Sequence, residues 1–86
     1  MDYEVEFMPE AIDELENLDR VLSERILKKI KWFFGNFEKI VPEPLTGELK
    51  GLFKLRIGSY RAVYSIDYDK RLIVIHLIDH RKDIYR

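Results

Sequence analysis

The 86-residue sequence contains no cysteine, a single tryptophan and only three prolines. The lack of cysteine excludes disulfides, thiolate metal sites and a cysteine nucleophile, and it suits a reducing compartment such as the cytoplasm. The most apolar run, residues 72–78, is far shorter than the roughly 20 residues that span a bilayer. No basic, apolar and small-residue series of a secretion signal opens the chain. We therefore expect a cytoplasmic protein without a membrane partner, folded as a single domain over residues 1–86.

Net charge is also nearly absent, at −1, but the charges are unevenly distributed. Residues 1–48 carry 12 acidic and 6 basic side chains, whereas residues 49–86 carry 4 acidic and 9 basic ones. A basic half made mainly of arginine is typical of phosphate binding, because the guanidinium fork matches phosphate oxygens and keeps its proton. The alternative is an ordinary solvated strand face.

The first half of the chain predicts one strand and two helices. Residues 3–7 alternate apolar and acidic side chains, which favours a short edge strand. Pro9 suits a first helical position, and an apolar stripe predicts a helix that ends near Asp19. Asp19 is a candidate N-cap for a second helix, and two helices this close form a hairpin. The apolar positions of the second helix are Leu22, Ile26, Ile30, Phe33, Phe34 and Phe37.

The second half predicts strands. Residues 42–47 contain two prolines and exclude both a helix and a central strand, so they form a loop. Alternation of period two then predicts a β-hairpin around Gly58 and Ser59, and residues 72–78 predict a central strand. The order is β-α-α-β-β-β, a two-layer α+β fold. We expect an antiparallel sheet with the helical hairpin packed on one face and the other face left for function.

Three cations are predicted to share the open face of this sheet. If the helices cover the face that carries Leu55 and Ala62, then Lys54, Arg56 and Arg61 project from the opposite face. Like charges that lie opposite one another on neighbouring strands are destabilising, so the cluster favours an external anion, most simply phosphate. The alternative is three solvated cations.

Residues 80–86 add further cations, an imidazole and a phenol. Such a segment could lean over the cationic face and stack an aromatic ring on a nucleobase, which contributes ~1–3 kcal/mol. The alternative is a solubilising tail. His76 and His80 lie four residues apart with no cysteine and no nearby carboxylate cluster. We therefore expect neither a metal site nor another cofactor.

The whole chain resembles the RelE/ParE toxin superfamily, and most closely the RelE-like ribosome-dependent mRNA endoribonucleases. The resemblance rests on the segments 7–11 and 44–52 and on two motifs, Gly-x-Tyr-Arg-x-x-Tyr at residues 58–64 and His-Arg-x-x-x-Tyr at residues 80–85. It implies the toxin of a type II toxin–antitoxin system. Such a toxin inhibits translation by cleaving mRNA codons in the ribosomal A site.

The resemblance also implies a reaction and the residues that carry it. The ribose 2′-hydroxyl attacks the adjacent phosphate, without a metal, so the enzyme must move protons and stabilise negative charge. By resemblance, Lys54 stabilises charge or acts as base, and Arg56 is a neighbouring cation. Arg61 would hold the scissile phosphate, Arg81 would stabilise or protonate the leaving 5′-oxygen, and Tyr85 would stack on or deprotonate the nucleotide.

A second acid/base scheme is possible on the same chain. Some relatives use a glutamate in a Pro-Glu-Pro-Leu loop with a histidine beside the terminal tyrosine, and Glu43 and His80 are the counterparts here. Free Lys, Tyr and Arg titrate near or above ~10, so a base among them needs neighbouring positive charge to lower its pKa. We rank the Lys/Arg/Tyr scheme first, because His80 precedes Arg81 and does not flank Tyr85.

The resemblance implies three partners: a cognate RelB-like antitoxin, the ribosome and mRNA. Trp32 falls on the charged side of the second predicted helix, where it is either an interface anchor for the antitoxin or a ring lying along the stems of Lys28 and Lys29.

Two alternative functions stay open: a ParE-like inhibitor of DNA gyrase, and a catalytically inactive toxin-like binding module. The complete set of cations with a terminal tyrosine favours the endoribonuclease, because ParE-like chains generally lack that set.

Overall fold

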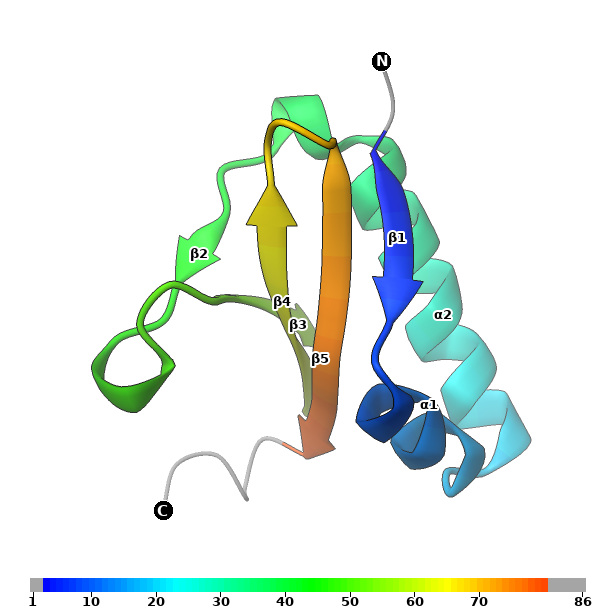
Figure 1. Cartoon of the computed structure of the whole chain (residues 1–86). Helices are drawn as coiled ribbons and strands as arrows, with labels where there is room; N and C mark the ends of the chain where they lie inside the picture. Colours follow the sequence, from blue (N-terminus) through cyan, green and yellow to red (C-terminus); the bar gives the residue numbers. More distant parts are fainter. Residues whose placement is uncertain (1–2, 81–86) are drawn as a thin grey trace.

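A computed structural model describes residues 3–80 as a layer of two helices against a five-stranded sheet (Figure 1). The strands lie in the order β1-β5-β4-β3-β2. This arrangement confirms the predicted α+β class. The elements are β1 (Glu4–Phe7), α1 (Pro9–Glu16), α2 (Arg20–Gly35), the 3₁₀ turn η1 (Phe37–Lys39), β2 (Glu43–Pro44), the 3₁₀ turn η2 (Gly47–Leu49), β3 (Phe53–Ile57), β4 (Tyr60–Asp67) and β5 (Leu72–His80).

The helical hairpin forms where local sequence signals predict it. Pro9 occupies the first turn of α1, and Met8 at the N-cap makes no side-chain capping hydrogen bond. Asp19 caps α2, because its Oδ1 accepts a hydrogen bond from the Leu22 N–H at 2.9 Å. Asp19 has an extended backbone conformation as the N-cap of α2, and α1 ends at Glu16, three residues before the predicted end.

The sheet is mixed, and the prediction of an entirely antiparallel sheet is wrong at one pair. β1 runs parallel to β5, with Glu4 opposite Leu72 and Phe7 opposite Ile75. Short turns dictate the antiparallel pairs β3–β4 and β4–β5. No turn joins β1 to a neighbouring strand, because the two helices intervene, so its direction does not follow from turn lengths.

The edges of the sheet agree with the sequence in part. β1 is an edge strand, as predicted, and β5 lies inside the sheet between β1 and β4. β5 extends to His80, two residues beyond the predicted end. The proline-rich loop contributes the two-residue strand β2 at the opposite edge, where a missing proline N–H is tolerated.

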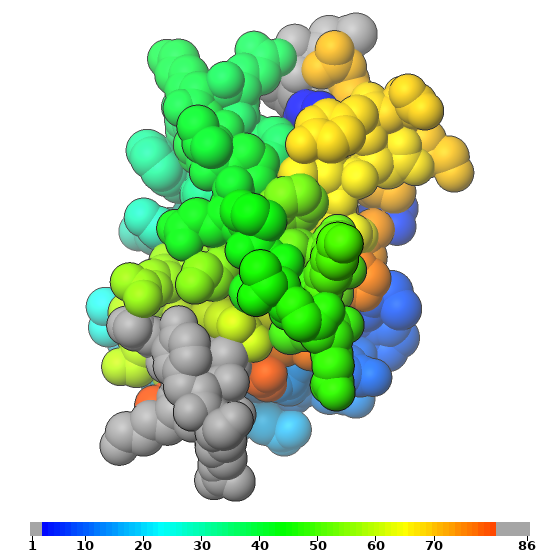
Figure 2. Space-filling view, turned by 90° about the vertical axis from the view of Figure 1, so that its left-hand side faces the viewer, coloured from blue at the N-terminus to red at the C-terminus, as the bar shows by residue number. Residues whose placement is uncertain are grey.

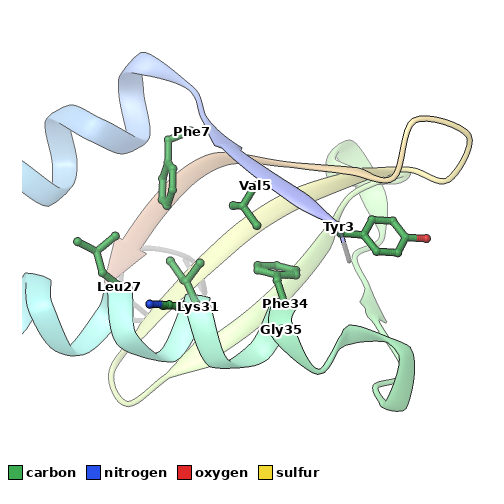
Figure 3. A pocket seen from close by; sticks show the side chains of 8 residues that line it. Tyr3, Val5, Phe7, Leu27, Lys31, Phe34 and Gly35 are labelled. Atoms are coloured by element: carbon green, nitrogen blue, oxygen red, sulfur yellow. The ribbon is translucent and has the colours of Figure 1, made fainter. Parts of the chain in front are cut away.

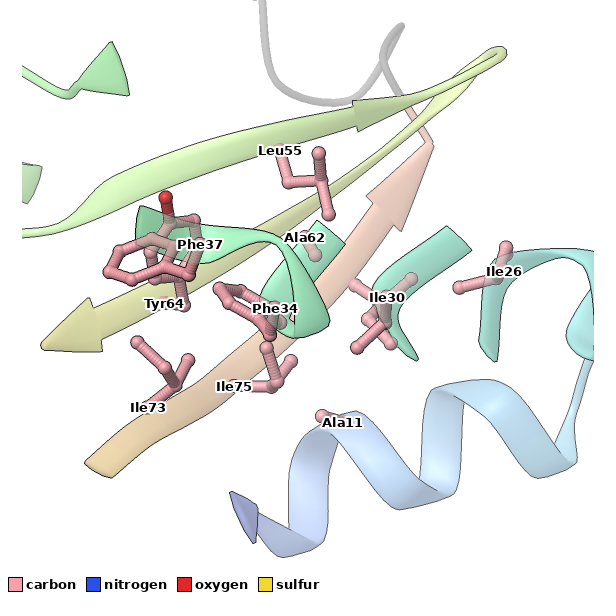
Figure 4. Close-up of a cluster of buried hydrophobic side chains, with 11 residues drawn as sticks. Ala11, Ile26, Ile30, Phe34, Phe37, Leu55, Ala62, Tyr64, Ile73 and Ile75 are labelled. Carbon is pink, nitrogen blue, oxygen red and sulfur yellow. The ribbon is translucent and has the colours of Figure 1, made fainter. Parts of the chain in front are cut away.

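The hydrophobic core lies between the helices and one face of the sheet (Figure 4). Phe34 of α2 contacts Tyr64 of β4, with ring centroids 5.0 Å apart, and Phe37 lies 5.6 Å from Phe34. Burial raises the pKa of the Tyr64 phenol well above its ordinary value, so Tyr64 stays protonated in the core. The core residues are Ala11, Ile26, Ile30, Phe34, Phe37, Leu55, Ala62, Tyr64, Ile73, Ile75 and Ile78.

Neither helix of the described part of the chain is long and apolar enough to cross a membrane.

Candidate functional site

The structure places three predicted site residues on the sheet face opposite the helices. Leu55 and Ala62 are strand partners whose side chains enter the core. Because successive side chains of a strand point to opposite faces, Lys54 and Arg56 of β3 and Arg61 of β4 project from the other face. Arg56 and Arg61 lie directly opposite one another in the register. The open face therefore brings the three cations together.

Arg61 differs from its two neighbours in its burial. Its residue is only 6% exposed, whereas Arg56 is exposed to solvent. A buried guanidinium needs compensating partners, and Asp79 of β5 lies directly opposite Arg61 in the β4–β5 pairing. An anion bound at Arg61 would thus meet a charge held in place by the sheet and screened little by water.

Glu43 approaches the cations from the edge of the sheet. β2 places Glu43 opposite Lys54, and the Lys54 Nζ lies 4.0 Å from the Glu43 Oε2. The carboxylate side chain is 64% exposed and the lysine side chain 21%. Such a long, half-solvated ion pair contributes little to stability. It does place two titratable groups, a carboxylate and an ammonium, together beside the open face.

The second 3₁₀ turn and the loop around it border this region. Figure 2 shows residues 40–52 in green running across the side of the molecule next to β3, which is drawn in lime. The segment that carries Glu43 thus forms one rim of the cationic face.

His80 lies apart from Glu43. It is opposite Tyr60 in the β4–β5 register, and the two rings meet at a centroid distance of 5.0 Å. Tyr60 shares strand parity with Ala62 and packs against the core, so His80 lies on the helix side of the sheet. The structure does not bring His80 together with Glu43. Arg81 and Tyr85 lie outside the described residues, and their positions stay predictions.

Sequence reasoning missed a carboxyl pair beside Arg61. The Glu14 Oε1 of α1 accepts a hydrogen bond from the Ile78 N–H of β5 at 3.1 Å, and its carboxyl hydrogen-bonds the Asp79 side chain. Burial, followed by Asp79 and Glu10, raises the pKa of Glu14 to about 7, against the lowering effect of the Ile78 hydrogen bond. The pair ties α1 to β5 at Asp79, the strand partner of Arg61.

This contact could be predicted only from the order and lengths of the strands in the sheet. β1 has four residues and β5 has nine, so the C-terminal half of β5 presents an open edge that needs acceptors. Glu14 supplies one of them. Its partner is 64 residues away in sequence, beyond the reach of a periodicity argument.

A serine and a histidine also meet between β4 and β5. Ser65 Oγ and His76 Nε2 are 2.8 Å apart, next to a register shift between Val63 and Tyr64. Across residues 3–80, no group of three or more His, Asp or Glu side chains is placed to hold a metal ion.

An apolar groove lies on the other side of the sheet from the cations. It has a volume of about 450 Å³ between β1 and α2 (Figure 3). Val5 and Phe7 face Leu27 and Phe34 across it, and Lys31 is its one charged lining residue. Its lining combines Tyr3 and Lys31 with apolar side chains and contains no acid and no histidine, so we assign it no catalytic role.

Known proteins are similar to this chain over nearly its whole length. The family described as the ParE toxin of type II toxin–antitoxin systems, parDE, matches residues 5–85. Toxin RelG of Mycobacterium tuberculosis (strain ATCC 25618 / H37Rv) is 40% identical over 90 residues, covering 100% of this chain and 99% of RelG.

Two solved structures show the same architecture. The toxin–antitoxin complex RelBE2 of Mycobacterium tuberculosis contains a chain with a TM-score of 0.81 and 30% identity, covering 94% of this chain and 100% of that one. The isolated RelE toxin of Escherichia coli matches with a TM-score of 0.72 and 21% identity, over 91% of this chain and 83% of the other. At that identity the second match supports the fold alone.

Proposed function

The chain belongs to the RelE/ParE superfamily of toxins from type II toxin–antitoxin systems, and from this premise we propose that it is a ribosome-dependent mRNA endoribonuclease. In this proposal it cleaves codons in the ribosomal A site and so inhibits translation in the cytoplasm. The observation that carries the proposal is the gathering of Lys54, Arg56 and Arg61 on the sheet face that the helices leave open.

The open face matches what phosphodiester cleavage by a 2′-hydroxyl demands. The transition state places extra negative charge on the phosphate, and preorganised cations stabilise that charge more than they stabilise the ground state. Arg61 is fixed by burial and suits the scissile phosphate. Arg56 lies opposite Arg61 and adds a second, solvent-exposed cation.

Proton transfer is assigned to the groups at the rim and to the C-terminal segment. Lys54, 4.0 Å from Glu43, stabilises charge or removes the 2′-proton. Arg81 stabilises or protonates the leaving 5′-oxygen, and Tyr85 stacks on or deprotonates the nucleotide. The Glu43/His80 scheme receives less support, because His80 lies on the helix side of the sheet next to Tyr60.

A RelB-like antitoxin is the proposed protein partner. The RelBE2 structure of Mycobacterium tuberculosis is a toxin–antitoxin complex and contains the chain similar to this one at 30% identity. The ribosome and mRNA are the proposed target. The proposed chemistry assigns no role to a metal or another cofactor.

Mapping of mRNA 5′ ends in a reconstituted translation reaction tests this function. Wild-type protein is compared with an Arg61→Ala/Arg81→Ala variant and with Lys70→Ala, which removes an exposed lysine from the β4–β5 turn. We expect cleavage only when ribosomes are present, lost in the arginine variant and retained in the lysine control. Intact mRNA under conditions where the folded wild type still arrests growth would contradict the proposal.

A gyrase inhibitor is the second candidate, because the family that matches residues 5–85 is that of the ParE toxins. A supercoiling assay with purified DNA gyrase separates the two functions. We expect no inhibition by this chain.

A further inference from the structure

A second cationic surface borders the proposed catalytic face and shares Arg56 with it. Arg25, Lys28 and Lys29 of α2 and Arg56 of β3 line a hollow of about 430 Å³ between the helix and the β3–β4 turn, which contributes Ile57 and Gly58. The three α2 side chains are exposed to solvent. We call this hollow the α2 basic groove. The N-terminal half of the chain, otherwise acidic, thus contributes most of the charge of a basic site.

These cations are not neutralised by carboxylates of the described residues. Within residues 3–80, the ion pairs of α2 and β3 join Arg20 to Glu24 and Lys54 to Glu43, and none involves the four cations of the groove. Like charges at helical spacings of three and four, as between Arg25 and Lys28 or Lys29, destabilise a helix by a few tenths of a kcal/mol. The cluster carries an electrostatic cost and has no carboxylate partner among the described residues, so it favours an external anion.

An aromatic ring belongs to the same helix face. Arg25, Lys28, Lys29 and Trp32 are spaced i, i+3, i+4, i+7, which places them along one side of α2. Trp32 is 58% exposed, and the Lys29 Nζ lies 5.2 Å from its ring centroid. The contact with Lys29 agrees with the alternative interpretation of Trp32, a ring that lies along the lysine stems. Its exposed ring area remains available for a ligand.

The α2 basic groove is continuous with the proposed catalytic face. Arg56 lines the groove and is also the strand partner of Arg61, so positive charge extends from the open face around β3 to α2. Cations interleaved with an exposed aromatic ring are typical of a nucleic-acid surface, where cations meet phosphates and the ring stacks on a base. The groove lies beyond the edge of the catalytic face, so a nucleotide bound there is not the one being cleaved.

We propose that the α2 basic groove binds the phosphodiester backbone of ribosomal RNA and that Trp32 stacks on an exposed base next to it. This inference rests on the proposed function, and it assigns a docking surface for the ribosome. A net charge of −1 disfavours binding to free RNA chains, whereas a local patch suits a structured RNA that presents several phosphates at fixed positions.

Binding to purified 70S ribosomes without mRNA tests the proposal, because it requires no cleavage. Affinity is measured as a function of salt for wild type, for Lys28→Gln/Lys29→Gln, and for Lys39→Gln/Lys70→Gln, a control that removes the same charge from exposed lysines elsewhere. We expect the α2 variant to bind about tenfold or more weakly and to lower the slope of log K against log salt by about 1.4–1.8. The control variant keeps the wild-type affinity and slope.

Two further measurements separate the possible ligands. Trp32→Leu is expected to weaken ribosome binding about fivefold or more with an unchanged salt slope, since it removes stacking and no charge. A short single-stranded mRNA fragment and a co-purified antitoxin are titrated with the same variants, and we expect smaller losses for both than for ribosomes.

Several outcomes would overturn the proposal. These are equal ribosome affinity for Lys28→Gln/Lys29→Gln and wild type, an equal loss in the lysine control, or a loss confined to the mRNA fragment or the antitoxin. Failure of this inference is distinguishable from failure of the proposed function. If the protein cleaves mRNA on the ribosome and Lys28 and Lys29 have no effect on binding, only the docking surface is rejected. If ribosome binding depends on the groove and no cleavage occurs, only the endoribonuclease function is rejected.

Discussion

The two faces of the sheet are built from the same strands but have different roles. On β3, Leu55 enters the core, while its neighbours Lys54 and Arg56 project from the open face. On β4, Ala62 and Tyr64 are fully buried beneath the helices, and Arg61 belongs to the cationic face. Successive side chains point to opposite faces in each regular part of a strand, so Leu55 contributes to stability while its neighbours Lys54 and Arg56 are proposed to act on RNA.

The largest expected effect comes from comparing two adjacent residues of β3. Leu55→Ala removes a buried side chain from the core and should destabilise the protein by about 2–5 kcal/mol. Lys54→Ala lies on the other face and should cost no more than about 1 kcal/mol, while lowering RNA cleavage. Urea unfolding measures the first effect and the cleavage assay the second. Similar losses of stability in both variants would contradict the division between faces.

A smaller effect is expected at Glu14, which joins α1 to the uncovered edge of β5. Its pKa is raised from 4.5 to about 7, so the folded state holds a proton that the unfolded chain releases at lower pH. The stabilising contribution of the protonated group is complete below pH 4.5 and is lost as pH rises through about 7. After allowance for solvent screening, the loss is on the order of 1–2 kcal/mol.

Glu14→Gln tests whether the titration of Glu14 lowers stability, because glutamine stays neutral and keeps an oxygen for the Ile78 N–H. We expect the variant to be more stable than wild type at pH 8 by about 1–2 kcal/mol and to flatten the decline between pH 5 and 8. The exposed Glu16→Gln on the same helix serves as the control. Identical pH profiles for wild type and Glu14→Gln would show that Glu14 does not titrate in this range.

The next effect in size is a change in stability at Tyr64, a residue of the hydrophobic core. Its hydroxyl is buried and has no hydrogen-bond partner among the described residues. Tyr64→Phe removes this uncompensated polar atom and should leave stability unchanged or raise it by up to about 1 kcal/mol. Ribosome-dependent cleavage should be unaltered, since the phenol faces the helices. A marked loss of cleavage with intact stability would place Tyr64 in the chemistry.

The smallest effect on stability is expected at the rim of the open face. Glu43→Ala breaks an exposed ion pair with Lys54 and should change stability by less than about 0.5 kcal/mol. Its effect on cleavage is the informative result. Activity that survives Glu43→Ala and is lost in Lys54→Ala supports the lysine scheme. The reverse pattern would assign the proton transfer to Glu43.

Local signals in the sequence account for much of this architecture. Pro9 and Asp19 mark the starts of the two helices, and the change from helical to alternating periodicity marks the β-hairpin. The alternation in β3 and β4 was sufficient to predict that Lys54, Arg56 and Arg61 share a face. The family resemblance extended that prediction to the superfamily and the fold, which the comparisons confirm.

Features that depend on distant contacts were not predictable in this way. The parallel pairing of β1 with β5 requires the path of the helical hairpin across the sheet. The contact of Glu14 with Ile78 follows from that pairing, because the short β1 leaves part of β5 uncovered. His80 lies on the helix side because a register shift in the β4–β5 pairing reverses the alternation of β5, so that Ile75 and then Ile78 enter the core. An irregularity of one residue moves every later side chain of the strand to the other face, and periodicity in the sequence does not reveal where it occurs.

The central claim is that the open cationic face cleaves mRNA on the ribosome. Single-turnover cleavage of an A-site codon on purified programmed ribosomes, with wild type and Arg61→Gln, tests it most directly, with folding of the variant verified by circular dichroism. We expect Arg61→Gln to lower the cleavage rate about 100-fold or more while ribosome binding is retained. Equal cleavage rates for the folded variant and wild type would contradict it.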